Sequence, residues 1–300
     1  MALQVTSLFL LSIVANFDKV AVLCHKKGCN GMLNRWPKDF QNRVHIFDGA
    51  QIDPMYTKQV GKRRKNEQPR QFFVTMSHVH VAQTLFANND TSSYLFLEED
   101  YEVVQPKTRS LSLKDSASNV ARFVEKNTSW QFLRLGYNPV WQAKQKNAVR
   151  CKAACLCQTV HNGICSITAG NFSKRSTCWI RSTVGYAVHR RAWTALQKLG
   201  NCTMGIFNYL TIDNWLPGFT RDCTNTSPVH YLIPGVFHQK VFGHSSKKYH
   251  AKAMESFSFK CTTSHNYSFP RNTSIGRSAD SSDEADSIQA HSNYSCSKKG

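Results

Sequence analysis

The chain has 300 residues, of which 41% are hydrophobic and 11% aromatic, so it can bury a substantial core. This composition excludes a protein that is disordered along its whole length. The formal net charge of +19 is compatible with binding nucleic acid, an anionic membrane, acidic glycans or a nucleotide diphosphate. The sharpest basic run, residues 62–65, has no interleaved aromatic residues, so nucleic acid is the least supported of these partners.

The N-terminal end carries a short apolar stretch over residues 8–14, followed by Ala15. Its length is typical of a signal peptide, and residues 1–16 are a candidate for one, although no positive charge precedes the stretch. The alternative is that this stretch is the first strand of the fold. No run reaches the roughly 20 apolar residues of a membrane-spanning helix, so no stable transmembrane anchor is expected.

Strands and helices alternate along the rest of the chain. We expect strands at 19–23, 44–47, 94–97, 131–136, 183–188 and 231–237, and helices at 72–86, 116–126 and 190–199. A turn is expected at Asp48-Gly49, and the last strand is interrupted at Pro234-Gly235. This alternation predicts one α/β domain over residues 17–261. Residues 262–300 are nearly free of apolar side chains and are expected to be a disordered, glycosylated tail.

The most informative run is the strand at 94–97, which leads directly into Glu98-Glu99-Asp100. Four apolar residues without alternation fit a strand buried on both faces of a parallel sheet. Ligand sites of open α/β sheets lie outside the carboxyl ends of such strands. On an extended segment, Glu98 and Asp100 would point to the same side and could share one divalent cation. The alternative is an acidic, solvated turn.

Eleven cysteines and eight Asn-X-Ser/Thr sequons bear on the compartment. The sequons lie at Asn89, Asn127, Asn171, Asn201, Asn225, Asn266, Asn272 and Asn293. Their number favours the lumen of the secretory pathway (endoplasmic reticulum or Golgi) or secretion. In that setting the cysteine-rich segment 151–178 is expected to be an irregular insertion stapled by disulfides. Zinc binding by its cysteines and His161 is the alternative, but their spacing matches no common zinc pattern.

Several short motifs, taken together with their order along the chain, resemble those of glycosyltransferase family 25, the lipooligosaccharide and procollagen galactosyltransferase group. The resemblance covers about residues 70–246. The matching pieces are Ser77-His78, Leu97-Glu98-Glu99-Asp100, Leu135-Gly136-Tyr137, the strand–helix pair at 183–199, Asp213, Pro234, Gln239 and Ser245-Ser246. Two departures stand out: Glu99 replaces an aspartate, and the N-terminal donor motif is only loosely echoed by residues 20–27.

The resemblance implies a GT-A-like fold, in which helices flank a mixed, mostly parallel sheet. It also implies inverting transfer of a hexose, galactose-like, from a nucleotide-sugar donor such as a UDP-sugar to a glycan or glycoprotein acceptor. Mn²⁺ or Mg²⁺ on Glu98 and Asp100 would neutralise the leaving diphosphate. Asp213 is the candidate general base, with a helix cap or turn as its alternative role, and Trp215 is a candidate platform for the acceptor sugar.

Four further residues are expected at the donor site from the same resemblance: Ser77, His78, Glu99 and Gln239. We expect His78 to orient the donor or the acidic loop, and Glu99 to face away from Glu98 toward a backbone or basic partner. Two other classes of protein stay open. One is a secreted, non-catalytic glycan-binding protein with the same fold, and the other is a secreted metal-dependent phosphodiesterase or nuclease. Release of UDP from UDP-sugars with Mn²⁺ would separate the enzyme from the binder.

Overall fold

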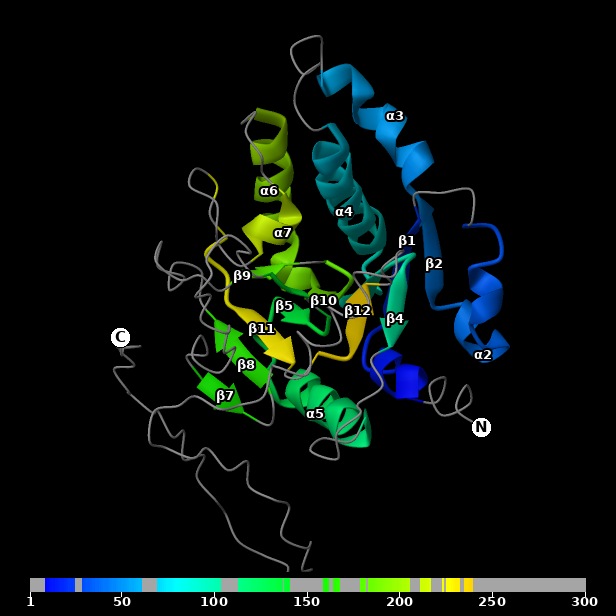
Figure 1. Cartoon of the computed structure of the whole chain (residues 1–300), viewed down its shortest axis with the longest axis vertical. Helices are drawn as coiled ribbons and strands as arrows, with labels where there is room; N and C mark the ends of the chain where they lie inside the picture. Colours follow the sequence, from blue (N-terminus) through cyan, green and yellow to red (C-terminus); the bar gives the residue numbers. More distant parts are fainter. Residues whose placement is uncertain are drawn as a thin grey trace, which may run out of the picture.

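A mixed eight-stranded sheet runs through the centre of the protein in the computed structural model (Figure 1). The structure describes residues 9–24, 29–60, 69–103, 113–136, 138–140, 159–161, 164–167, 179–181, 183–205, 211–216, 223, 225–232 and 235–239. The strand order is β2 (Val44–Asp48), β1 (Lys19–Cys24), β3 (Ser93–Glu98), β10 (Gly185–His189), β5 (Phe132–Arg134), β11 (Val229–Leu232), β8 (Ile164–Ile167) and β7 (Thr159–His161).

Most of these strands run in one direction. β2, β1 and β3 are mutually parallel, and so are β5 and β11. β10 runs antiparallel to both of its neighbours, and β8 runs antiparallel to β11 and β7. The predicted architecture of a mixed, mostly parallel sheet flanked by helices is therefore confirmed.

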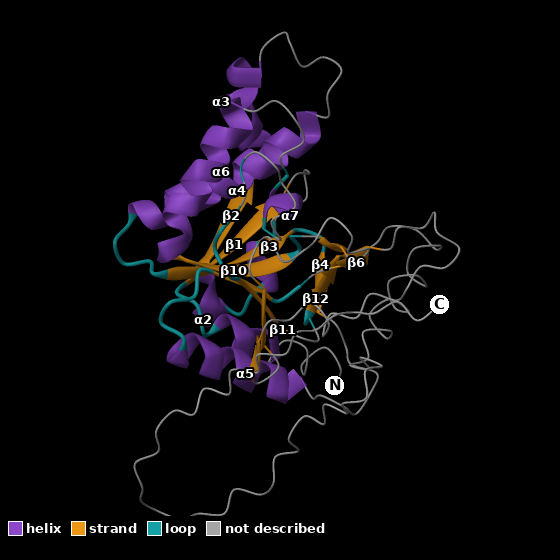
Figure 2. Cartoon of the chain, turned by 90° about the vertical axis from the view of Figure 1, so that its left-hand side faces the viewer, coloured by secondary structure: helices purple, strands orange, loops and turns teal. Residues whose placement is uncertain are grey.

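Helices cover both faces of the sheet (Figure 2). One layer holds α3 (Gly49–Val60), α4 (Pro69–Ala87), α6 (Trp193–Gly205) and the short α7 (Ile212–Trp215). The other holds α5 (Leu113–Lys126) and a helix at residues 9–14. Successive side chains of a strand point to opposite faces. Tyr94 and Phe96 of β3 accordingly pack under the first layer, and Leu95 and Leu97 pack under the second. This two-sided burial explains the unbroken apolar run before the acidic residues.

The N-terminal stretch is part of the core rather than a strand. Residues 9–14 are helical, Ile13 and Val14 are fully buried, and Phe9 is only 6% exposed. Cleavage after Ala15 would take these three side chains out of the core. Among the described residues, no helix has the length and apolar character needed to cross a bilayer.

Two expected elements differ from the sequence prediction. Asp48-Gly49 is not a turn: α3 begins at Gly49, and the Asp48 carboxylate accepts a hydrogen bond from the Ala50 amide at 2.9 Å. The expected strand at 231–237 is two strands in different sheets. β11 ends at Leu232 in the main sheet, whereas β12 (Phe237–Gln239) pairs with β4 (Tyr101–Val103). A further small sheet joins β6 (Asn138–Val140) to β9 (Trp179–Arg181).

The cysteine-rich segment 151–178 is not irregular throughout. Residues 159–161 and 164–167 form the β7–β8 hairpin, which extends the main sheet beyond β11 (Figure 1). The remainder of that segment lies outside the described residues, so its predicted disulfides stay a prediction. The tail at 262–300, the basic run at 62–65 and Ser245-Ser246 also lie outside the described residues.

Candidate active site

Chemically distinctive residues gather at one edge of the main sheet. The carboxyl ends of β2, β1, β3 and β5 carry Asp48, Cys24, Glu98 and Arg134. Because β10 is antiparallel, its amino end lies at the same edge, and Thr183 comes just before it. This edge also contains the point where the strand order reverses, because β2 and β3 lie on opposite sides of β1. Open α/β sheets bind their ligands at such a point.

The acidic run turns at this edge instead of continuing as a strand. β3 ends at Glu98, and Glu99 and Asp100 form the turn that leads into β4. The premise that Glu98 and Asp100 lie on one extended segment is therefore wrong. All three acids are partly exposed.

Neighbouring acids of the run have different surroundings. Glu98 accepts a hydrogen bond from the Thr183 hydroxyl, on the β10 side of β3. The Glu99 carboxylate lies instead beside the thiols of Cys24 and Cys29, on the β1 side. Glu98 and Glu99 therefore have different neighbours, and the thiols beside Glu99 were not expected; the predicted backbone or basic partner of Glu99 stays a prediction.

A buried histidine and tyrosine lie beneath the acidic turn. His78 of α4 is fully buried, and its Nδ1 shares a hydrogen bond with the Tyr186 hydroxyl at 2.7 Å. The imidazole also stacks on Phe96, with ring centroids 4.1 Å apart. Because His78 has no exposed surface, its side chain does not reach a ligand directly, and its predicted role in orienting the donor or the acidic loop stays a prediction.

Three charged side chains act on Tyr186 from different parts of the chain. Burial raises the pKa of its phenol well above the usual value, and nearby Tyr94, Glu98 and Asp213 raise it further, whereas Arg134 opposes them. The phenol therefore keeps its proton across the ordinary pH range. Glu98 and Asp213, which are 115 positions apart in sequence, both lie within electrostatic reach of this one hydroxyl.

Arg134 is the cation of this group and is fully buried at the end of β5. Its guanidinium carbon lies 5.4 Å from the centroid of the Tyr231 ring on the neighbouring strand β11. A buried guanidinium is tolerated only where anions and hydrogen-bond acceptors surround it. Arg134 gives the acidic edge a fixed positive charge.

Asp213 is held in place by the packing of α7. Ile212, Trp215 and Leu216 are at most 1% exposed, and the Ile212 amide donates to the Thr75 hydroxyl of α4 at 3.2 Å. Asp213 lies in the first turn of α7 and keeps part of its surface exposed. An acid in that position is stabilised by the helix dipole, so its structural role and its proposed catalytic role are compatible.

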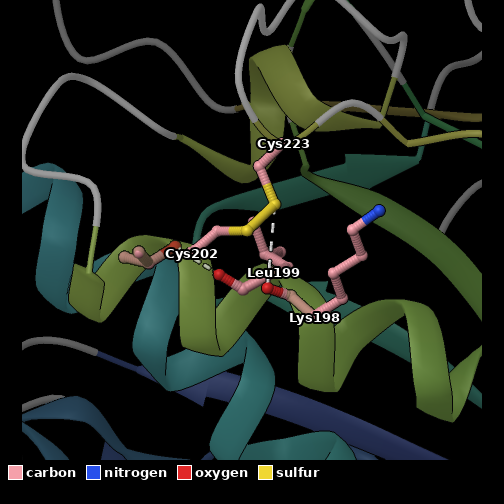
Figure 3. The surroundings of a disulfide bond; sticks show 5 residues. Lys198, Leu199, Cys202 and Cys223 are labelled. Atoms are coloured by element: carbon pink, nitrogen blue, oxygen red, sulfur yellow. Dashed lines mark hydrogen bonds between the residues drawn. A yellow bond between two sulfur atoms is a disulfide. The ribbon is translucent and has the colours of Figure 1, made fainter.

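A disulfide closes the segment that carries α7 (Figure 3). Cys202 of α6 is bonded to Cys223, 21 positions later, and their Cα atoms are 6.2 Å apart. The Cys223 sulfur lies 3.7 Å from the carbonyl oxygen of Lys198, one turn earlier in α6. Both ends of the segment that contains Asp213 are therefore joined to α6. The sequence analysis did not pair these two cysteines.

The position of the Gln239 backbone depends on Phe237, which anchors the same strand by filling the space above two glycines. Phe237 is fully buried, and a Cβ atom on Gly185 would lie 2.6 Å from its ring, whereas one on Gly136 would lie 2.7 Å from its Cβ. Phe237 anchors β12 there, and the next residues pair with β4, so that Gln239 stands opposite Tyr101. Tyr101 follows the acidic turn directly, which places the Gln239 backbone beside it.

Two expected contributors do not reach a ligand. Trp215 is 1% exposed and packs edge-on against Phe132, with ring centroids 5.8 Å apart, so the predicted acceptor platform is wrong. Ser77 is fully buried in α4, and its hydroxyl has no hydrogen-bond partner among the described residues. Its predicted contact with the donor would require α4 to move.

Sequence reasoning missed Arg134, Tyr186, Cys24 and Cys29. A charged residue inside the apolar run Phe132–Leu135 was the available signal for Arg134. The other three could not be found from spacing, because they meet their neighbours only through the pairing of β1, β3 and β10.

The fold buries the asparagine of one predicted glycosylation sequon, Asn225. Asn225 is 1% exposed, its amide nitrogen donates to the Leu216 carbonyl at 3.1 Å, and its Oδ1 accepts from the Ser227 amide at 3.0 Å. The folded chain cannot carry a glycan there. Asn89 and Asn201 are exposed and remain available.

Comparisons with known proteins add little to this picture. No family model matches the sequence, and no curated protein matches it. Among solved structures, the chain is similar to a glycosyltransferase involved in the glycosylation of the major capsid of PBCV-1. The two share 8% identity with a TM-score of 0.31, over 79% of this chain and 98% of that one. A likeness of this size carries no argument about function. The class that the fold defines is a mixed α/β protein.

Proposed function

We propose that this protein is an inverting glycosyltransferase with a GT-A-like fold, related to family 25. It moves a hexose, galactose-like, from a nucleotide-sugar donor, a UDP-sugar, to a glycan or glycoprotein acceptor. The observation that supports this is that Glu98 and Asp213 both act electrostatically on the buried Tyr186 hydroxyl. Glu98 was proposed from the end of its strand and Asp213 from the resemblance, and the two acids come from distant parts of the chain.

The donor's diphosphate would lie at the turn between β3 and β4. Glu98 and Asp100 are oxygen ligands at the edge where nucleotides bind in such sheets, and both are partly exposed. Mg²⁺ and Mn²⁺ sites commonly use one or two carboxylates and complete their coordination with water and substrate phosphates, so Glu98 and Asp100 would need to supply only one or two oxygens. Bound there, the cation would neutralise charge on the leaving diphosphate.

Asp213 would take the proton of the acceptor hydroxyl as that oxygen bonds to the anomeric carbon. The bond from this carbon to the diphosphate breaks, the nucleotide leaves with the electron pair, and the configuration inverts. The anchoring of α7 by Thr75 and by the Cys202–Cys223 disulfide suits a base that must stay in one place. His78 and Tyr186 would support the acidic turn from the core side, and Gln239 would lie beside that turn.

The disulfide and the exposed sequons support a compartment for the protein. A disulfide between Cys202 and Cys223 is typical of a protein that folds in an oxidising environment. Together with the exposed sequons at Asn89 and Asn201, it supports a place in the lumen of the endoplasmic reticulum or Golgi, or secretion. The charge of +19 favours anionic ligands such as nucleotide diphosphates.

The test combines a donor panel with one acid and its matched control. With Mn²⁺ present, the full chain should release UDP from at least one UDP-sugar. Asp213→Asn should lower transfer by about 10²–10⁴-fold, because the base is lost, while nucleotide binding and melting temperature stay near their original values. Asp115→Asn is the control: Asp115 also lies in the first turn of a helix, but it is exposed on α5, so only stability should change.

Two results would contradict the proposal. If no donor is hydrolysed or transferred while glycans bind, the protein is the non-catalytic binder instead. If Asp213→Asn loses activity only in proportion to a lowered melting temperature, Asp213 is a structural residue.

A further inference from the structure

Two thiols and a carboxylate meet at the carboxyl ends of β1 and β3. The sulfur atoms of Cys24 and Cys29 and a carboxylate oxygen of Glu99 all lie within 4.8 Å of one another. Among the described residues, this is the one group of three or more such ligands that comes together. Cys24 is the last residue of β1, and Glu99 is the first residue after β3.

The backbone fixes two of these ligands relative to each other. β1 and β3 are parallel neighbours with Leu23 opposite Glu98, and the Glu99 amide donates to the Leu23 carbonyl at 2.9 Å. Cys24 and Glu99 therefore extend from adjacent strand ends in a set register. Cys29 returns to the same place five residues after Cys24.

The group of three ligands is accessible from one side. Cys24 is fully buried, whereas Cys29 and Glu99 keep part of their surface exposed, so the group opens to one side. A cation bound among these groups would hold the cysteines as thiolates and displace their protons.

We propose that Cys24, Cys29 and Glu99 bind a zinc ion, with the fourth position open to water or to an exogenous ligand. Tetrahedral zinc with Zn–S bonds of about 2.3 Å holds its sulfurs roughly 3.8 Å apart, which the observed limit of 4.8 Å allows after a small adjustment. Binding releases the two thiol protons to solvent and leaves two thiolates and one carboxylate on the ion. Zn²⁺ suits this set because thiolate ligands favour it over Mn²⁺ or Mg²⁺.

The zinc site is separate from the carboxylate pair proposed for the nucleotide. The Glu98 carboxylate accepts a hydrogen bond from the Thr183 hydroxyl on the β10 side of β3, whereas the Glu99 carboxylate lies near the two thiols on the β1 side. The main rival is a disulfide between Cys24 and Cys29. A disulfide would join only the two sulfur atoms, whereas zinc binds all three converging groups, and the experiment below decides between them.

The experiment uses the full chain loaded with Zn²⁺ and then with Co²⁺, whose spectrum reports its ligands. Wild-type protein should hold one equivalent of cobalt at this site, with a thiolate-to-cobalt charge-transfer band and the visible bands of tetrahedral coordination. Cys29→Ser should remove most of that band and weaken zinc binding by at least about 100-fold, since even outer-shell losses cost 10–100-fold. Glu99→Gln should weaken binding while keeping the sulfur band.

Two controls separate this site from others in the chain. Asp100→Asn changes the adjacent acid of the same turn and should leave zinc affinity and the sulfur band unchanged, whatever it does to sugar transfer. Cys155→Ser should also leave them unchanged, because that cysteine belongs to a different segment. Cys29 is partly exposed, so its serine variant should fold; its circular dichroism and melting curve verify this.

Any of three results would overturn the proposal. The first is a cobalt spectrum without a sulfur band in the wild type. The second is an unchanged band in folded Cys29→Ser. The third is peptide mapping without reductant that finds Cys24 and Cys29 mainly joined to each other. None of these readouts depends on glycosyltransferase activity, so failure of the zinc site and failure of the proposed function are distinguishable.

Discussion

Phe237 packs against Gly185 and Gly136 through different atoms, so double mutants should distinguish the two contacts. A Cβ on Gly185 would meet the ring atoms Cδ2 and Cγ of Phe237 at 2.6 and 3.0 Å. A Cβ on Gly136 would meet the Phe237 Cβ at 2.7 Å, its carbonyl oxygen at 2.9 Å and Val184 Cγ1 at 2.8 Å. Neither glycine has a positive φ, so alanine meets a steric obstacle and no backbone strain.

These distances set the expected magnitudes. Each contact is several tenths of an ångström closer than ordinary carbon–carbon packing, and overpacking of this kind costs about 1–3 kcal/mol of unfolding free energy. Gly185→Ala and Gly136→Ala should therefore each destabilise the protein by about that amount. Phe237→Ala alone should cost about 3–5 kcal/mol, because its ring is fully buried.

The double mutants should then differ. Phe237→Ala removes the two closest atoms that oppose Gly185→Ala and leaves only the Cβ of residue 237, at 3.1 Å, so adding Gly185→Ala to it should cost much less than in the wild type. The Cβ and carbonyl oxygen that oppose Gly136→Ala remain in Phe237→Ala, so that pair should stay near additive.

Urea unfolding followed by tryptophan fluorescence measures all five variants and the wild type. The expected interaction energy is about 1–3 kcal/mol for the Gly185 pair and clearly smaller for the Gly136 pair. Additive behaviour of the Gly185 pair would refute the reasoning, and so would Gly185→Ala with wild-type stability. Either result would mean that Phe237 does not occupy the space above Gly185.

Three further perturbations have defined outcomes. Asp100→Asn should abolish most Mn²⁺-dependent hydrolysis of the UDP-sugar donor with the melting temperature unchanged; near wild-type hydrolysis at limiting Mn²⁺ would remove Asp100 from the metal site. Burial lowers the pKa of His230 to about 4, below its unfolded value near 6.5, so the unfolded state binds the proton first and stability should fall as pH drops from about 6.5 to 4. The loss should reach at most roughly 3 kcal/mol in urea unfolding, and His230→Gln should flatten the slope in that window. Ile13→Ala should cost about 2–5 kcal/mol and the half-buried Leu10→Ala less; equal, small losses would show that the helix at 9–14 is not part of the core.

The strands of this fold could be predicted where burial alone determines them. β1 and β3 are apolar runs covered by helices on both faces, and their pattern is visible without any partner. The same holds for α4 and α5, which were expected within a few residues of their ends. Such elements depend on local composition.

The parts that could not be predicted depend on contacts between distant residues. The sequence predicts one strand over residues 231–237 with an interruption at Pro234-Gly235, but not that its two halves belong to different sheets, with Phe237 in the space above Gly136 and Gly185. The acidic run was taken as extended, and its turn at Glu99 is fixed by a hydrogen bond to Leu23 of another strand. In the site, Glu98 and Asp213 were named from the sequence, whereas Tyr186, on which both act electrostatically, was not. Within an apolar strand, a tyrosine is read as one more core residue.

The Cys202–Cys223 bond makes the proposed chemistry depend on where the protein is made. Closing a loop of this length removes about 3 kcal/mol of chain entropy from the unfolded state, and the loop contains Asp213. In a reducing cytosol the sheet could still assemble, but the tether on the far side of α7 would be absent and the effective concentration of Asp213 at the sheet edge would fall. Protein prepared in such a host would then underreport transfer while looking folded. The disulfide forms only in an oxidising compartment such as the lumen. Oxidative folding of the chain would therefore decide whether Asp213 is held in the position that its proposed role as general base requires.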